Sequence, residues 1–316
     1  MNNVINMCFA TIPHVVGFRC IEAMFGTSPA YVEDSLMNYC IYYSSVIEIM
    51  FNRITRAPSR LGKGELVEEM KQVGSQLVVL SLYCSILVPY DFAPFNAPVE
   101  AHTMNHTLSD MFHLGHLGNN LAAAFLTYMA LNFSFSATGL AVNACGFRTG
   151  AMMNNPLLLS KSPSDFWSRR WNQVVQGMLK RGVFKPILKM SASKIFATML
   201  TFIVSGLLHE YDWSLIFFVH QEEYDDDGHC TTSCFQPVYG KNLLFFGWNG
   251  MIMVLEYLLG GYWLFQWMKM TFPPPLVTFL VIMTAIPVCH LYTGDWIKGG
   301  FFSQLIIGLP VIVRVS

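Results

Sequence analysis

The feature that most constrains this chain is an uncharged stretch that runs directly into ionisable residues. Residues 195–208 carry no charge, and His209, Glu210 and Asp212 follow within the same apolar segment, 195–219. As a helix these 25 residues span about 37 Å, enough to cross a hydrocarbon core of about 30 Å. An ionisable group inside a membrane is costly unless it faces protein or a wet cavity. His209 beside Glu210 therefore predicts a functional site, with a capped or interfacial histidine as the alternative.

Composition supports a membrane location for the whole chain. The sequence has 316 residues, of which 53% are hydrophobic and 12% charged, and its mean hydropathy is +0.41. Soluble domains carry about twice that share of charged residues. A net charge of -1 gives no field that would attract nucleic acid. We therefore expect an integral membrane protein that contacts membrane lipids and has no nucleic-acid partner.

Further apolar segments predict a polytopic bundle. They are 4–18, 37–51, 72–90, 117–144, 242–267, 275–292 and 299–313. The clearest spans are 72–90 and 117–144, whereas 4–18 is short and interrupted by Pro13 and His14. We expect an all-α integral membrane helical bundle of about six to eight transmembrane helices, forming one membrane domain over residues 1–316.

The distribution of basic residues predicts the orientation of this bundle. Five of the 19 Lys and Arg residues lie in 51–71 and nine lie in 146–194, with two predicted spans between the two loops. Basic loops remain in the cytosol by the positive-inside rule. Both loops are therefore expected on the cytosolic side, and the acidic loop around 221–227 on the opposite side.

Four histidines cluster in the loop before residue 117: His102, His106, His113 and His116. Their spacings of three and four residues resemble those of metal ligands. Membrane di-iron oxidoreductases need a larger histidine set than this loop offers, which leaves that class a weak alternative. We expect a histidine-rich loop with no metal bound.

The middle of the second basic loop contains helix signals. Ser162 is a predicted N-cap, Pro163 occupies the first helical position, and Asp165 stands where a capping box places its acid. Apolar residues then recur at helical spacing, at Trp167, Trp171, Val174 and Met178. The pattern predicts one amphipathic helix, which an interfacial location would also explain.

Two motifs in this region resemble those of a known family. The run DFWSRRWN at 165–172, followed by VSGLLHE at 204–210, resembles the wax synthase branch of the membrane-bound O-acyltransferases. The resemblance is strongest over 155–236, which we take as a wax synthase-like catalytic core. It implies a multispanning enzyme of the endoplasmic reticulum membrane that esterifies a long-chain alcohol with fatty acyl-CoA, without a further cofactor. It also implies that one or two N-terminal helices of the family are missing here.

The resemblance assigns the family's catalytic histidine and asparagine to His209 and Asn172. Glu210 followed by Tyr211 is instead similar to the diacylglycerol and sterol acyltransferase branch, so those acceptors remain alternatives. A non-catalytic membrane homologue or a transporter is a third possibility, since charges inside a membrane also mark transport paths.

The residue types suit ester formation from a thioester. A neutral imidazole at His209 is a suitable general base for a hydroxyl group. On a helix, Ser205 and Asp212 can reach its ring more easily than the adjacent Glu210. Asn172 would hold the developing oxyanion. For this, the segment 163–190 has to dip into the bundle as re-entrant structure.

Acyl-CoA needs a second set of residues at the cytosolic mouth. The phosphates of CoA suit guanidinium and ammonium groups, and aromatic rings can cover its apolar parts. The residues expected to bind acyl-CoA are Arg169, Arg170, Trp167 and Trp171, with Lys180 and Arg181 nearby.

Overall fold

The computed structural model describes residues 3–217, 227, 235 and 237–312. Within them every regular element is helical, apart from two isolated β-bridges, and this confirms the all-α class. The long helices are α1 (Asn3–Phe25), α3 (Lys63–Leu87), α5 (Leu114–Ala144), α10 (Lys194–Ile216) and α11 (Lys241–Leu259). The shorter ones are α2 (Leu36–Ser44), α4 (Leu108–Met111), α6 (Pro156–Leu159), α7 (Pro163–Asp165), α8 (Gln173–Leu179), α9 (Lys185–Ser191), α12 (Trp263–Thr271), α13 (Pro274–Met283), α14 (His290–Lys298) and α15 (Phe301–Leu305).

Fewer helices can cross a membrane alone than the sequence predicts. Among the described residues, α1, α3, α5 and α11 are long and apolar enough, and α13 with α14 would make a fifth span bent by 62°. Helix α10 is 23 residues long but is not among them, because polar residues occupy its last turns. A polytopic helical membrane protein is confirmed, with four or five such spans in place of six to eight.

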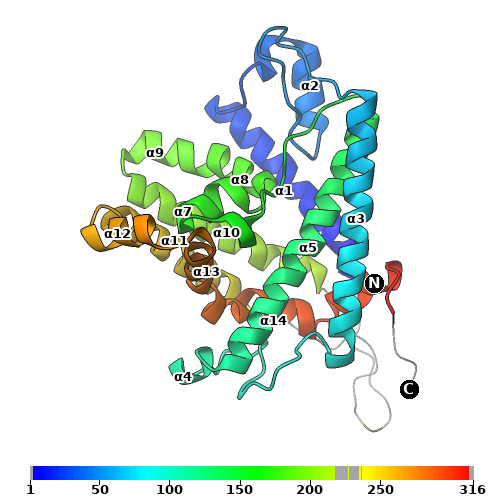
Figure 1. The fold of residues 1–316 in the computed structure, drawn as a ribbon. Helices are drawn as coiled ribbons and strands as arrows, with labels where there is room; N and C mark the ends of the chain where they lie inside the picture. The colour runs from blue at the N-terminus through cyan, green and yellow to red at the C-terminus, as the bar shows by residue number, and fades with distance from the viewer. Residues whose placement is uncertain (1–2, 218–226, 228–234, 236, 313–316) are drawn as a thin grey trace.

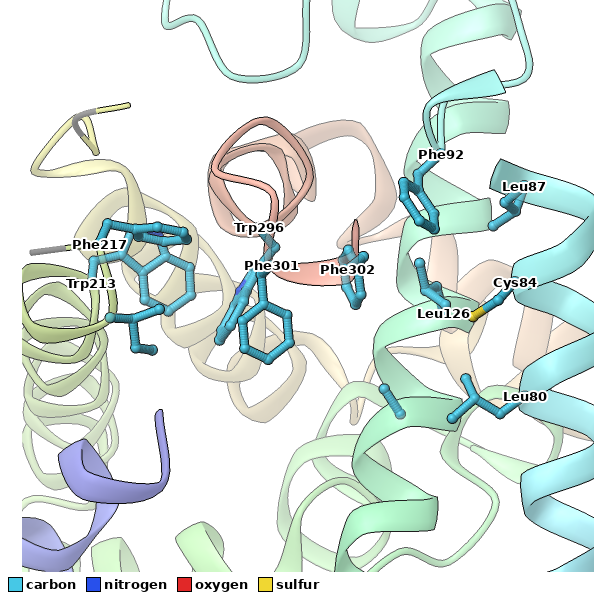
Figure 2. Close-up of a cluster of buried hydrophobic side chains, with 12 residues drawn as sticks. Leu80, Cys84, Leu87, Phe92, Leu126, Trp213, Phe217, Trp296, Phe301 and Phe302 are labelled. Atoms are coloured by element: carbon cyan, nitrogen blue, oxygen red, sulfur yellow. The ribbon is translucent and has the colours of Figure 1, made fainter. Parts of the chain in front are cut away.

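Helix α10 lies at the centre of the fold. It packs along α11 and crosses α1, while α3 and α5 run side by side as a pair on the other side of the molecule (Figure 1). Trp296 of α14 and Phe301 and Phe302 of α15 fill the space between the two groups (Figure 2). They join Leu126 of α5 to Trp213 of α10 in one buried cluster.

The two basic loops meet at one end of the bundle. Ile49 pairs with Thr149 in an antiparallel bridge, and the Met50 amide donates to the Arg148 carbonyl at 2.8 Å. This arrangement agrees with a shared compartment for both loops. The end of the first loop is helical, however, because α3 begins at Lys63, where Glu65 accepts a hydrogen bond from the Gly62 amide at 2.9 Å. The predicted acidic loop lies outside the described residues, except for Asp227.

The predicted C-terminal segments are broken into shorter helices. The apolar run 242–267 divides at Gly260, where α11 ends before α12 begins. The run 275–292 bends between Val288 and His290, just after Pro287. Of the run 299–313, only the five residues of α15 and one 3-10 turn are helical within the described part. Glycine and proline interrupt the helices even though the residues on both sides are apolar.

The expected continuous amphipathic helix after Ser162 is wrong. Ser162 does cap α7, since its hydroxyl accepts from the Asp165 amide, but α7 has three residues and continues as a π-helical turn, Phe166–Arg170. The chain then breaks at Asn172 and restarts as α8. The residues listed above as one helical face therefore belong to two separate elements.

This broken segment packs against α1 and α10. Gly182 lies against Phe18 of α1, so closely that a Cβ atom at Gly182 would come 2.4 Å from the ring. Arg181 donates from Nε to the buried Glu22 of α1 at 3.0 Å, and its carbonyl accepts from Thr27 Oγ1 at 2.8 Å. Segment 163–190 is therefore fixed against α1 and α10.

Candidate active site

His209 is held in one orientation by its own helix. Its Nδ1 lies 2.7 Å from the carbonyl oxygen of Ser205, one turn earlier in α10. Because a carbonyl only accepts hydrogen bonds, Nδ1 carries the proton and Nε2 carries the free lone pair. The ring stacks on Phe246 of α11 at 4.4 Å between centroids and meets Tyr292 of α14 edge-on at 5.4 Å.

The two acids near His209 serve other partners. Glu210 accepts a hydrogen bond from the backbone amide of Leu243 in α11 at 3.1 Å. Asp212 Oδ1 lies 3.3 Å from Nδ1 of His14 in α1. Among the described residues, neither carboxylate makes a hydrogen bond or an ion pair with the His209 ring. The support expected from Ser205, Glu210 or Asp212 thus comes from the backbone carbonyl of Ser205.

Asn172 has a backbone conformation that asparagine tolerates better than most residues. Its φ of 36° and ψ of 70° are left-handed, and the residue caps α8, because Oδ1 accepts from the Val175 amide at 3.2 Å. The capping bond uses the side-chain oxygen. The side-chain nitrogen, Nδ2, makes no hydrogen bond to the described residues and is free to donate to a ligand.

One cavity of about 560 Å³ contains both residues on its wall. His209 and Ser205 contribute from α10, Asn172 from the break before α8, and Tyr292 from α14. The volume falls in the range of about 300–1,000 Å³ that is usual for small-molecule sites. Most of the wall area is apolar, with aromatic rings on several sides, and polar side chains are interspersed along it. Such a cavity suits a long apolar ligand with a reacting polar end.

The two tryptophans of the motif have different positions. Trp167 lies among the aromatic residues between α10 and α11, with its ring edge-on to Phe202 at 5.7 Å and its Nε1 donating to Asn249 at 3.3 Å. Trp171 stacks on Phe166 at 5.5 Å. Both tryptophans line the cavity, so both remain candidates for contact with a ligand.

Some basic residues of this region are exposed at the cavity, and others are held in ion pairs with acidic side chains. Arg169, Lys180 and Lys194 are exposed and line the cavity, so they mark its opening to solvent. Arg170 instead donates to Asp165 at 2.6 Å. Burial alone would raise the pKa of Asp165, but the hydrogen bond from Arg170 and its charge bring this pKa below the ordinary value. Arg170 therefore stabilises the segment and does not line the cavity.

Arg181 is also engaged. Its guanidinium bonds Glu22 and Glu48 at 3.0 and 2.9 Å, which leaves it little capacity for a phosphate. Of the basic residues that the sequence suggested for CoA, Arg169 and Lys180 remain available. Lys194, the first residue of α10, joins them and was not anticipated.

The structure adds functional neighbours that the sequence did not single out. Phe246 and Tyr292 enclose the His209 ring, and His14 lies beside Asp212 and Tyr211. His14 had one sequence signal, as a polar residue inside an apolar segment. The two aromatic residues had none, because aromatic residues are frequent throughout the chain.

Comparison with known proteins places this chain in a family. The model of the membrane-bound O-acyltransferase family matches residues 61–222, just over half of the chain, and includes both Asn172 and His209.

Curated relatives from Arabidopsis thaliana match shorter parts. An acyl-CoA–sterol O-acyltransferase is 34% identical over 121 residues, 33% of this chain and 34% of the relative. Two probable long-chain-alcohol O-fatty-acyltransferases are 42% identical over 74 residues (21% of this chain and 20% of the relative) and 30% identical over 131 residues (40% and 35%). The matched parts thus span about a third or less of these relatives.

Proposed function

Because this chain belongs to the membrane-bound O-acyltransferase family, we propose that it transfers a fatty acyl group from acyl-CoA to the hydroxyl of a lipid alcohol. One observation carries the proposal. A histidine with a free Nε2 and an asparagine with a free Nδ2 line the same apolar cavity within the helical bundle. The first group is a base and the second is a hydrogen-bond donor, as attack on a thioester requires.

The reaction follows from these two groups. The alcohol oxygen attacks the thioester carbonyl carbon while its proton passes to Nε2 of His209. The new oxyanion accepts a hydrogen bond from Nδ2 of Asn172. When the carbonyl reforms, the carbon–sulfur bond breaks and the imidazolium returns its proton to the CoA thiolate. Ser205 keeps Nδ1 protonated throughout and prevents the ring from turning.

The two substrates are proposed to reach the cavity from different sides. The charged head of acyl-CoA suits the exposed Arg169, Lys180 and Lys194, while its acyl chain suits the aromatic interior. The lipid alcohol is already dissolved in the bilayer. This division supports a protein of the endoplasmic reticulum membrane, where both substrates are available.

Long-chain alcohol is the proposed acceptor. The run 165–172 resembles the wax synthase motif, and the relatives include probable long-chain-alcohol acyltransferases. A sterol or diacylglycerol is the second candidate, because Glu210 followed by Tyr211 resembles that branch and one relative is named as a sterol acyltransferase.

Replacing the two proposed catalytic residues tests their roles. His209→Ala should lower turnover at least about 10²-fold, the lower end of what a positioned base contributes. Asn172→Asp keeps the oxygen that caps α8 but loses the amide donor, so it should lower turnover about 10²- to 10³-fold at unchanged thermal stability. The assay is transfer of labelled acyl groups by purified protein.

The control is His113→Gln, which replaces the exposed N-cap histidine of α5 with a residue that can also accept from the Gly115 amide, and it should retain full turnover. Full activity in His209→Ala would refute the base. An inactive wild-type chain with every acceptor offered would favour the non-catalytic homologue or the transporter.

A neighbouring pair of arginines tests the CoA contact. Arg169→Gln should raise the KM for acyl-CoA about tenfold, because one charge-assisted hydrogen bond is lost, and leave the melting temperature unchanged. Arg170→Gln should instead lower the melting temperature, because Asp165 loses its partner. Steady-state kinetics and thermal unfolding separate the two effects. The same KM shift in both variants would contradict the assignment.

Competition tests the acceptor. Hexadecanol, a diacylglycerol and a sterol are offered together to microsomes that contain this chain, with one labelled acyl-CoA. Label is expected mainly in wax ester. If label enters steryl ester or triacylglycerol and none enters wax ester, the acyltransferase stands but the long-chain alcohol is the wrong acceptor.

A further inference from the structure

Three histidines from distant parts of the sequence meet outside the cavity. His106 comes from the loop before α4, His116 from the first turn of α5, and His290 from the start of α14. One ring nitrogen of each lies within 4.8 Å of the others, and the ring centroids are 4.1–4.8 Å apart. His116 and His290 are buried and His106 is half-buried. None of the three lines the catalytic cavity.

The cluster contains buried nitrogen atoms without protein partners. Both ring nitrogens of His106 and both of His290 are buried and make no hydrogen bond of ordinary geometry to the described residues. Most buried polar atoms in folded proteins have such a bond, so four exceptions in one place need a cause. Apolar packing gives none, because phenylalanine or leucine would fill the same space without the loss of hydration.

His116 is held in a way that suits a ligand to a metal. Its Nε2 lies 3.3 Å from the carbonyl oxygen of Pro287 and 3.0 Å from Nδ2 of Asn120. Nε2 can accept from the Asn120 amide or donate to the Pro287 carbonyl, depending on the tautomer. Metal binding would select the second tautomer, which leaves the lone pair on Nδ1. Metal-binding histidines commonly donate their second nitrogen to a backbone carbonyl in this way.

The surrounding charges permit a cation. Neutral imidazole is the form of histidine that binds a metal ion. The ammonium of Lys241 is the nearby positive charge, but it bonds Asp295 at 2.5 Å, and both side chains are buried. The carboxylate of Asp110 is a nearby negative charge, which favours a cation beside His106.

We propose that His106, His116 and His290 bind a divalent transition-metal ion, with zinc as the ion expected. Neutral imidazole suits zinc, which binds histidine nitrogen at about 2.0–2.1 Å, so tetrahedral ligand nitrogens lie about 3.3 Å apart. The three rings must therefore draw together slightly. The ring nitrogens of His106 and His290 make no hydrogen bond of ordinary geometry that would have to be broken for this. Water would complete the coordination.

The ion would tie the histidine-rich loop and α5 to α14. Helix α14 carries Tyr292, two residues after His290, against the catalytic histidine. The metal would thus brace one wall of the cavity from outside. It takes no part in the proposed acyl transfer, and the binding test below does not depend on that function.

Metal content of the purified full chain tests the site. After loading with zinc and removal of the excess, elemental analysis should find about one zinc ion per wild-type chain. His106→Ala, His116→Ala and His290→Ala should each lose most of it. His113→Gln, which changes an exposed histidine of the same loop, should keep it. Zinc should also raise the melting temperature of the wild-type chain but not that of His106→Ala.

Cobalt gives a second readout, since its visible spectrum reports tetrahedral nitrogen coordination. His106→Ala alters a half-buried loop residue and is the variant least prone to misfold, so it decides the result if the other two fail to fold. The proposal is overturned if the wild-type chain, loaded with zinc, cobalt or copper, retains less than about a tenth of an equivalent. It is also overturned if His106→Ala retains as much metal as His113→Gln.

Discussion

The two acidic side chains of α10 face partners on neighbouring helices, and this constraint shapes the centre of the protein. Glu210 Oε1 accepts a hydrogen bond from the Leu243 amide of α11. The two helices approach closely there because Gly206 has no side chain, and a Cβ at Gly206 would lie 2.8 Å from Leu243 Cα. Asp212 faces His14 of α1. With both acids engaged, His209 is left with the Ser205 carbonyl on one nitrogen and the cavity beside it. The environment of His209, the proposed base, therefore depends on the partners of its neighbours as well as on its own contacts.

The sequence predicts the helices whose boundaries are set locally. The uncharged runs that became α3, α5 and α10 are long, and the cap at Ser162 is a short-range pattern. The sequence did not predict the break at Asn172, because asparagine also occurs within helices and its left-handed conformation depends on tertiary packing. The short C-terminal helices were missed for a related reason, since apolar composition alone does not distinguish a spanning helix from a bent or buried one.

The sequence singles out the two central residues of the candidate site, but it does not predict which residues surround them. Asn172 and His209 stand in motifs, and the structure places both on one cavity. The division of the basic residues depends on contacts within the fold, because Arg170 bonds Asp165 and the Asn154 carbonyl whereas Arg169 faces the cavity. The histidine cluster is a clearer case. His106 and His116 were visible as a spacing, but their third member, His290, is 174 residues further along the chain than His116. Such a set appears only when the helices are packed.

The most direct measurement of the central claim is an experimental structure of this chain in membrane-like particles, with a non-hydrolysable acyl-CoA analogue and the alcohol bound. The carbonyl that replaces the thioester should lie within about 3 Å of Asn172 Nδ2, and the alcohol oxygen within about 3 Å of His209 Nε2. The CoA phosphates should lie beside Arg169. An analogue whose carbonyl lies outside the cavity, or a His209 ring whose Nε2 faces away from the alcohol, would contradict a reaction built on these two residues.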